Sequence, residues 1–189
     1  MLGKEDTAVR GNFLSALAML IAVSVTLINI FNPLLIIIGI SIGAVVGSVI
    51  ALKVKMTSIP EMVALFNGFG GLATFFIAWS EFNSSIDNSF QYILIMITVY
   101  IGGVTFSGSI IAYGKLSERL KIAKTSVITK LFTTIFYISL VYLLYSAALT
   151  EIFIPTFDFF TVLLVLTLLG GIGFVLPIGG GDMPVVISL

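Results

Sequence analysis

The sequence predicts an all-α, polytopic membrane protein, a bundle of about six transmembrane helices followed by the start of a seventh. Of 189 residues, 59% are hydrophobic and only 10% are charged, whereas soluble domains carry roughly 25% charged residues. Five intervals contain no Asp, Glu, Lys or Arg: 11–52, 62–80, 88–114, 131–150 and 159–181. A helix needs about 20 apolar residues to cross the hydrocarbon core. The first interval is therefore long enough for two spans and each of the others for one.

Helices are favoured over a closed β-barrel, the other structure that can span a bilayer. Barrel strands alternate polar and apolar residues over about ten positions, and runs such as 33–38 do not alternate. We expect residues 1–189 to form one transmembrane domain. Its spans are predicted at residues 12–31, 33–52, 61–79, 90–113, 129–149 and 158–178, with a truncated helix from 184.

Local signals mark several boundaries of these spans. The first span is longer than the apolar core of a signal peptide and lacks a small-residue cleavage site after it. Asn32 and Pro33 predict the turn before the second span. Ser58 and Glu61 have the spacing of a capping box at the start of the third. Asp182, followed by Met183 and Pro184, predicts the start of the truncated helix.

The charged residues predict the orientation of the bundle. All nine basic residues lie on one side of the predicted topology or at its border: Lys4, Arg10, Lys53, Lys55, Lys115, Arg119, Lys121, Lys124 and Lys130. The opposite side carries only acidic residues, namely Glu81, Asp87, Glu151 and nearby Asp158. Because basic residues mark the cytoplasmic side, the N-terminus is predicted to be cytoplasmic.

The composition excludes several classes of function. The net charge is zero, so there is no electrostatic basis for binding nucleic acid. The chain has neither Cys nor His, so we expect no metal site and no catalytic residue, and no nucleophile–base pair is evident. Gly170, Gly171 and Gly173 do not form a dinucleotide-binding motif, because that motif requires a preceding strand and a soluble helix.

Small residues in the second and third spans predict close helix packing. Gly39, Gly43 and Gly47 recur every four residues on one face of the second span. Gly71 lies in the third span on the face of Asn67. Glycines on one face allow another helix to approach closely, so we interpret these four as packing residues.

Polar residues in the third and fourth spans leave two interpretations open. Thr98, Gly102, Thr105 and Ser109 form one stripe along the fourth span, which can pack closely or line a hydrated path. In the third span, Asn67 lies about nine residues, or ~13 Å, beyond the predicted helix start. A buried amide needs a hydrogen-bond partner, which is either another helix or water in a transport pathway.

Three segments, taken together and in this order, resemble one known family. They are residues 56–65, the stretch 103–109 with 112–116, and residues 176–186, whose Leu-Pro-Ile-Gly-Gly-Gly-Asp-Met-Pro-Val-Val is the most specific. They resemble the membrane domain of the β subunit of proton-translocating NAD(P)⁺ transhydrogenase. The resemblance covers essentially the whole chain, although the stretches between these segments match mainly in hydropathy.

The resemblance implies a function that this chain serves only within a complex. Family members couple hydride transfer between NADH and NADP⁺ to proton movement across the inner (plasma) membrane. NAD and NADP would be bound by other domains and not by this chain, which alone should catalyse nothing. The implied partners are the α subunit, the NADP-binding domain and the lipid bilayer, in a dimer of the full complex. Compared with the family, the chain resembles an internal piece that lacks helices at both ends.

The resemblance also implies roles for individual residues. Asn67 matches a position of the family's proton path, and we add Thr74, Thr105 and Ser109 to that path. Glu61 and Asp182 would lie at the cytoplasmic junction and act in gating. Two other functions remain open at this point, namely an unrelated small transporter or channel and a structural membrane subunit.

Overall fold

The computed structural model describes residues 5–28, 34–83, 89–120, 127–149 and 157–183. These residues form six α-helices and two short 3-10 helices: α1 (Glu5–Ile28), α2 (Leu34–Lys53), η1 (Met56–Ser58), α3 (Ile59–Phe82), α4 (Ser89–Leu116), α5 (Val127–Leu149), α6 (Phe157–Val175) and η2 (Gly180–Asp182). No strand occurs in the described parts of the chain. The predicted all-α class is confirmed. The helix predicted from 184 lies outside the described residues.

Length and composition agree with a membrane bundle. Five helical segments are long and apolar enough to cross a membrane: Val9–Leu27, Leu34–Lys53, Met56–Phe82, Ser89–Leu116 and Val127–Tyr145. A sixth, Phe160–Val175, is apolar but shorter. Many large hydrophobic side chains are exposed on these helices, which suits a lipid environment. The chain is a multi-pass membrane protein.

The chain divides into two compact units, Met1–Lys53 and Val54–Leu189. The first unit contains α1 and α2. No described residue of α2 is buried, because the described parts of α1 and α2 do not pack against each other. The second unit contains the other four α-helices and both buried clusters of the described structure.

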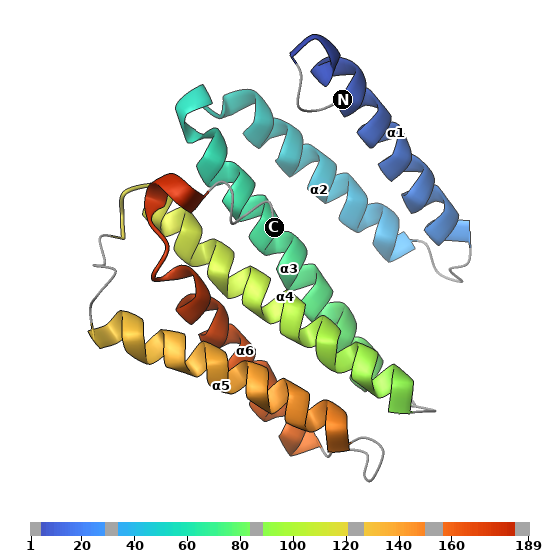
Figure 1. The fold of residues 1–189 in the computed structure, drawn as a ribbon. Coiled ribbons are helices and arrows are strands. Elements are labelled where there is room, and N and C mark those ends of the chain that lie inside the picture. The colour runs from blue at the N-terminus through green and yellow to red at the C-terminus, as the bar shows by residue number, and fades with distance from the viewer. Residues whose placement is uncertain (1–4, 29–33, 84–88, 121–126, 150–156, 184–189) are drawn as a thin grey trace. The chain divides into compact units, whose positions relative to one another are not determined.

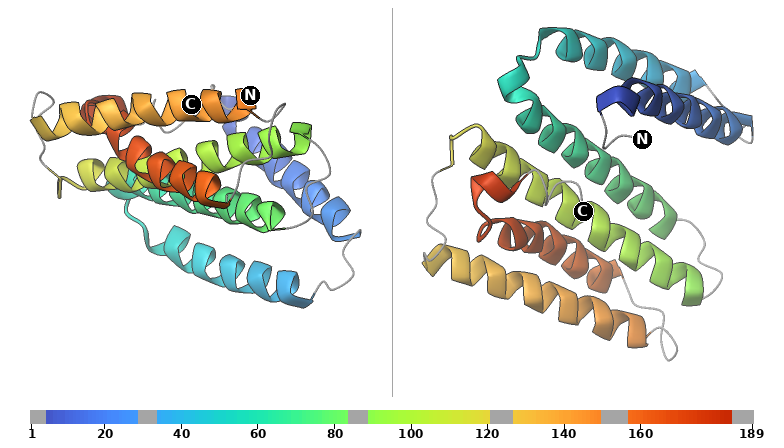
Figure 2. Two further views of the ribbon diagram at one scale, coloured as in Figure 1. Left: turned by 90° about the horizontal axis from the view of Figure 1, so that it is seen from below. Right: turned by 45° about the horizontal axis from the view of Figure 1, so that its top comes forward.

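The helices of the second unit do not follow their chain order. α4 lies between α3 and α6, and α6 lies between α4 and α5; Figures 1 and 2 show these four helices side by side in that order. The starts of α3 and α5 and the ends of α4 and α6 are at the same end of this unit (Figure 1). We call this the basic end, because it carries Lys55, Lys115, Arg119 and Lys130.

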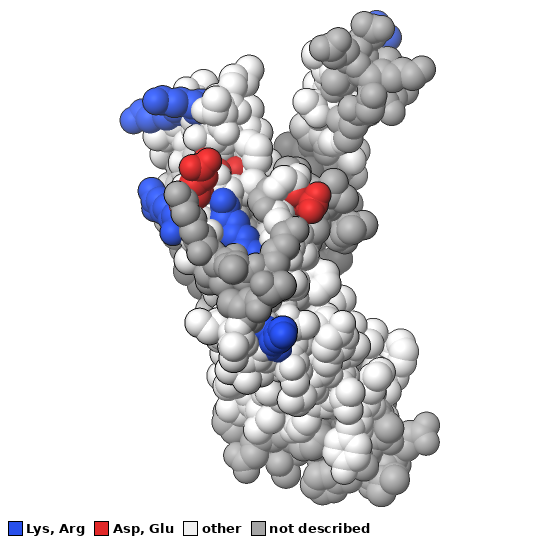
Figure 3. Space-filling view, turned by 60° about the vertical axis from the view of Figure 1, so that its left-hand side comes forward, with Lys and Arg blue, Asp and Glu red and all other residues white. Residues whose placement is uncertain are grey.

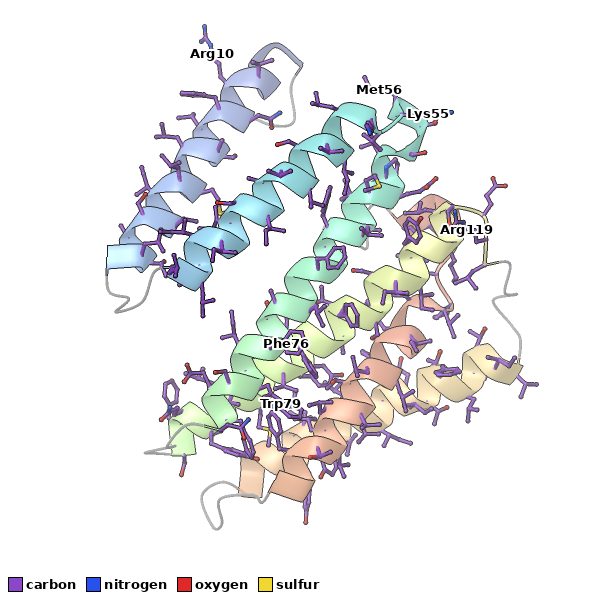
Figure 4. All side chains as sticks on the ribbon, turned by 180° about the vertical axis from the view of Figure 1, so that it is seen from behind. Arg10, Lys55, Met56, Phe76, Trp79 and Arg119 are labelled. Atoms are coloured by element: carbon purple, nitrogen blue, oxygen red, sulfur yellow. The ribbon has the colours of Figure 1, made fainter. Side chains whose placement is uncertain are left out.

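The charged surface and the aromatic side chains distinguish the two ends of this unit. On the face of the second unit drawn in Figure 3, the charged side chains gather toward one end of the helices, and the described part of that face beyond them is uncharged. Figure 4 places Lys55, Met56 and Arg119 near the basic end, and Phe76 and Trp79 toward the far end of α3.

Aromatic rings pack together where α3 ends and α6 begins. The rings of Phe82 and Phe160 are stacked with their centroids 3.9 Å apart. Trp79 meets Phe160 edge-on at 6.2 Å, and Phe82 lies 6.2 Å from the fully buried Tyr92. This cluster joins α3, α4 and α6 at the end opposite the basic residues.

Glycine permits a close approach of α3 and α4. A Cβ atom added at Gly71 would lie 2.7 Å from the backbone nitrogen of Phe106, and one added at Gly102 would lie 2.7 Å from that of Phe75. Cβ atoms essentially never approach other atoms within 3.0 Å. Gly71 and Gly102 therefore let the two backbones come closer than any other residue type allows.

α6 is held between α4 and α5 through its own glycines. A Cβ atom at Gly171 would lie 2.4 Å from the carbonyl oxygen of Val104 on α4. A Cβ atom at Gly173 would lie 1.8 Å from the carbonyl oxygen of Phe132 on α5. Both contacts are with backbone atoms, which cannot rotate away as a side chain can. The glycines of α6 therefore pack on two sides of the helix, Gly171 against α4 and Gly173 against α5.

Two local expectations differ from the structure. The span predicted to run to residue 178 ends as a helix at Val175, because Pro177 lacks the N–H that would continue the hydrogen-bond ladder. The capping box is not formed, since the Ser58 side chain makes no cap hydrogen bond. Ser58 closes a 3-10 turn with φ −97° and ψ 5°, whereas a capping side chain requires extended backbone at that position.

Candidate functional site

A groove between α3 and α4 collects most of the polar residues singled out in these two helices. It has a volume of about 400 Å³ and is lined by Phe66, Asn67, Gly70, Gly71, Thr74, Ile101, Gly102 and Thr105. Gly71 and Gly102, at the close approach of the helices, form part of its wall. We refer to it as the polar groove.

Asn67 and Ser109 are joined across the two helices. Asn67 Nδ2 donates a hydrogen bond to Ser109 Oγ at 3.0 Å. Ser109 is buried, with 5% of its surface exposed, and a Cβ atom at Gly68 would lie 3.1 Å from the Ser109 Cβ. The sequence leaves open whether Asn67 binds a neighbouring helix or faces a pathway. In the structure the Asn67 amide nitrogen contacts α4 and the side chain also lines the polar groove, and its part in a pathway stays a prediction.

Two polar groups of the groove lack a protein partner. Within the described parts of the chain, no hydrogen bond is found for the Asn67 oxygen Oδ1 or for the Thr105 hydroxyl. The Thr74 hydroxyl donates to the Gly70 carbonyl of its own helix at 3.0 Å and keeps its acceptor positions. A polar group without a partner in an apolar medium costs several kcal/mol, so the groove favours water or a polar partner.

A second groove lies on the other side of the α3–α4 contact. It has a volume of about 340 Å³ and is lined mainly by apolar side chains: Ala64, Leu65, Gly68, Phe69, Leu72, Phe106, Ser109, Ile110 and Tyr113. Helical periodicity places Phe69 and Leu72 on one side of α3 and Asn67 and Thr74 on the other. Residues 69 and 70 thus line different grooves at the same depth.

The polar stripe predicted along α4 is divided in the structure. Gly102 and Ser109 are buried against α3, and Thr105 lines the polar groove. Thr98 donates to the Leu94 carbonyl of its own helix at 2.7 Å and is not a lining residue. One face of α4 therefore has two roles: part of it packs against α3, and part of it lines the polar groove.

The predicted junction residues lie at the basic end. Glu61 is half-buried in the first turn of α3, and Asp182 is exposed in η2. The Asp182 N–H donates to the Gly179 carbonyl at 3.1 Å. Met183, the next residue, is fully buried beside Ala64 and Ala112, so the segment that carries Asp182 is attached to α3 and α4.

The glycine face of α2 has no neighbour in the described structure. A Cβ atom at Gly39, Gly43 or Gly47 would meet nothing within 4 Å. Their role in helix packing stays a prediction.

The glycines of α6 do not fit a nucleotide. Gly171 and Gly173 are buried against Val104 and Phe132, so their N–H groups cannot reach a phosphate. No group of three or more potential metal ligands occurs in the described residues.

Comparison with known proteins identifies the family of this chain. The sequence profile described as NAD(P) transhydrogenase beta subunit matches residues 1–189. Two relatives named NAD(P) transhydrogenase subunit beta, both from Rhodospirillum rubrum, are 32% identical over 201 residues, which cover 100% of this chain. The chain belongs to the NAD(P) transhydrogenase beta subunit family. It spans 42% of the length of these relatives.

Sequence reasoning missed one residue of this beta-subunit chain that makes several contacts. The Lys115 ammonium, on the last turn of α4, donates to the backbone carbonyls of Val175 and Ile178 at 3.1 and 2.8 Å and also to that of Leu176. In the sequence Lys115 is only one of nine basic residues. The sequence contains one signal for this role, which is Pro177. Because proline has no N–H, it leaves nearby carbonyl groups of α6 without intrahelical donors.

Proposed function

We propose that this chain is the proton-conducting membrane part of a transhydrogenase complex that couples hydride transfer between NADH and NADP⁺ to proton movement. Membership of the beta-subunit family supports this function. The observation that carries the proposal is the polar groove, in which Asn67 and Thr105 present polar atoms that no described residue of the chain binds. The nucleotides bind to other domains, and the α subunit and the NADP-binding domain are the partners, in a dimer of the complex.

The groove suits a chain of water molecules. Asn67 Oδ1 accepts a hydrogen bond, and the hydroxyls of Thr105 and Thr74 can orient water along the groove. Ser109 holds the Asn67 amide from the other helix. The chain contains no His, and an amide does not titrate near neutral pH. We infer that the titratable group beside Asn67 comes from another part of the complex. Glu61 and Asp182 act at the junction with the NADP-binding domain.

Cysteine accessibility tests whether the groove is hydrated. Gly70→Cys places a thiol in the polar groove, where an added Cβ meets nothing within 4 Å. Phe69→Cys is the matched control, one residue away in the apolar groove. Only the thiolate reacts with alkylating reagents, and it forms in water. We expect Gly70→Cys to react with a hydrophilic reagent at least about 10-fold faster. A Gly70→Cys thiol that reacts as slowly as a thiol shielded from water would show that the groove is dry and refute a water-filled path.

The orientation is the second part of the proposal. We infer that the basic end faces the cytoplasm, that the N-terminus lies on the same side, and that the protein resides in the inner (plasma) membrane. Reporter tags at Ser117 and Lys53 are expected to report the cytoplasm, and a tag at Asn83 the opposite side. Protease protection of tagged vesicles provides the measurement. If Asn83 and Ser117 report the same side, α4 does not cross the membrane.

A further inference from the structure

The contacts of Lys115 attach the end of α6 to α4. Its ammonium donates to the backbone carbonyls of Val175, Leu176 and Ile178, and the side chain is half-buried. Three carbonyl groups from three positions around the end of one helix thus converge on a single cation from another helix. We call this arrangement the lysine clamp.

The end of α6 requires such donors. The last carbonyl groups of any helix have no intrahelical partner, and they form the negative end of the helix dipole. Pro177 removes a further donor, the one that would serve the Gly173 carbonyl four residues earlier. The Thr133 hydroxyl of α5 lies 3.2 Å from that carbonyl oxygen and shares its single hydrogen between it and the Thr129 carbonyl of its own helix at 2.9 Å. Side chains of α4 and α5 therefore add donors at the end of α6, beside the local bond from the Ile178 N–H to the Val175 carbonyl at 3.1 Å.

The clamp acts on the segment that carries Asp182. Only three residues separate Ile178 from Asp182, and these are the glycines 179–181. Beyond them, Met183 is buried with Ala64, Ala112 and Val175. The glycine segment is thus attached on one side by the clamp and on the other by Met183, while the Asp182 side chain stays exposed.

One rigid helix joins the clamp to the polar groove. Ser109, the partner of Asn67, lies six residues before Lys115 on α4. This separation is about 9 Å along a continuous helix. α4 is uninterrupted between these two residues, so a displacement of the helix at Ser109 would also shift Lys115 at the end of α6.

We propose that Lys115 is a positioning residue that couples the Asn67–Ser109 contact to the Asp182 segment by clamping the end of α6 to α4. This inference rests on the proposed function for its role in coupling. The clamp itself is a structural claim, and it can be measured without proton transport.

The test uses the complete complex in membrane vesicles, with Lys115→Met, Lys115→Arg and the control Lys130→Met. Lys130 is an exposed lysine at the same end. A spin label at Gly181→Cys, where an added Cβ atom meets nothing within 4 Å, reports the mobility of the Asp182 segment. Each variant is also assayed for protons moved per hydride transferred.

We expect Lys115→Met to increase the mobility of the label and to lower the proton-to-hydride ratio at least twofold. Lys115→Arg should preserve both values, since a guanidinium also donates to several carbonyls, and Lys130→Met should change neither. If Lys115→Met does not assemble, Lys115→Gln replaces it.

Unchanged mobility would overturn the clamp. Increased mobility with an unchanged proton-to-hydride ratio would overturn its role in coupling. A dry groove in the cysteine test would instead refute the proposed function and leave the mobility result intact.

Discussion

Replacing Asn67 with leucine is expected to abolish most proton-coupled transhydrogenation by the complete complex. Leucine is similar in size but offers water no hydrogen bond, so the water chain would break beside Thr105. The Ser109 hydroxyl would also lose its donor. Loss of one buried hydrogen bond costs about 1–3 kcal/mol, and 1.4 kcal/mol corresponds to about a 10-fold change in rate. We therefore expect at least a 10-fold decrease in transhydrogenation driven by the membrane potential.

The controls for this experiment separate transport from folding. Phe69→Leu changes a side chain of the apolar groove at nearly the same depth and should leave coupling unchanged. Asn67→His should retain coupling and make it dependent on pH, because histidine titrates near neutrality. Hydride exchange by the soluble domains alone should survive all three changes. A well-folded Asn67→Leu complex that couples at the normal rate would show that Asn67 serves only to join α3 and α4.

Gly173→Ala is expected to give the largest loss of stability of any single methyl addition discussed here. The new Cβ atom would lie 1.8 Å from the carbonyl oxygen of Phe132 and 2.4 Å from its carbonyl carbon. Overpacking costs about 1–3 kcal/mol where side chains can shift, and a backbone obstacle places this change at the upper end. A loss of about 3 kcal/mol lowers the Tm of a domain of about 150–250 residues by about 6–12 °C, and a decrease in Tm is expected for the complex as well.

A matched substitution isolates the steric effect. Gly70→Ala adds the same methyl group inside a helix of the same unit, but its Cβ atom meets nothing within 4 Å. Because alanine has the higher helix propensity, Gly70→Ala should be neutral or slightly stabilising. Thermal unfolding of the purified complex in detergent provides the measurement. Equal Tm values for the two variants would mean that α6 does not pack on α5 as the structure describes.

The sequence alone determined the helices and their chemical character. Long uncharged intervals predict the spans, because hydrocarbon excludes charge along the whole length of a helix. Alternate loops of a membrane bundle lie on the same side of the membrane. The distribution of basic residues therefore predicts which helix ends are on that side. Asn67 stands out by itself, because an amide far from both ends of an apolar span requires a partner wherever it points. These inferences need only the distance along the chain and the periodicity of a helix.

Only the tertiary structure decided how the helices meet. α6 lies between α4 and α5, an order that differs from the order in the chain, and this placement gives Gly173 its contact with Phe132. In the same packing, part of the polar stripe of α4 is buried against α3 and part of it lines the polar groove. The packing also brings Lys115 to the end of α6. The physical reason is that glycine and hydroxyl faces permit close packing without specifying a partner. The partner depends on the rotation and neighbours of each helix, which are settled by all the contacts of the bundle together.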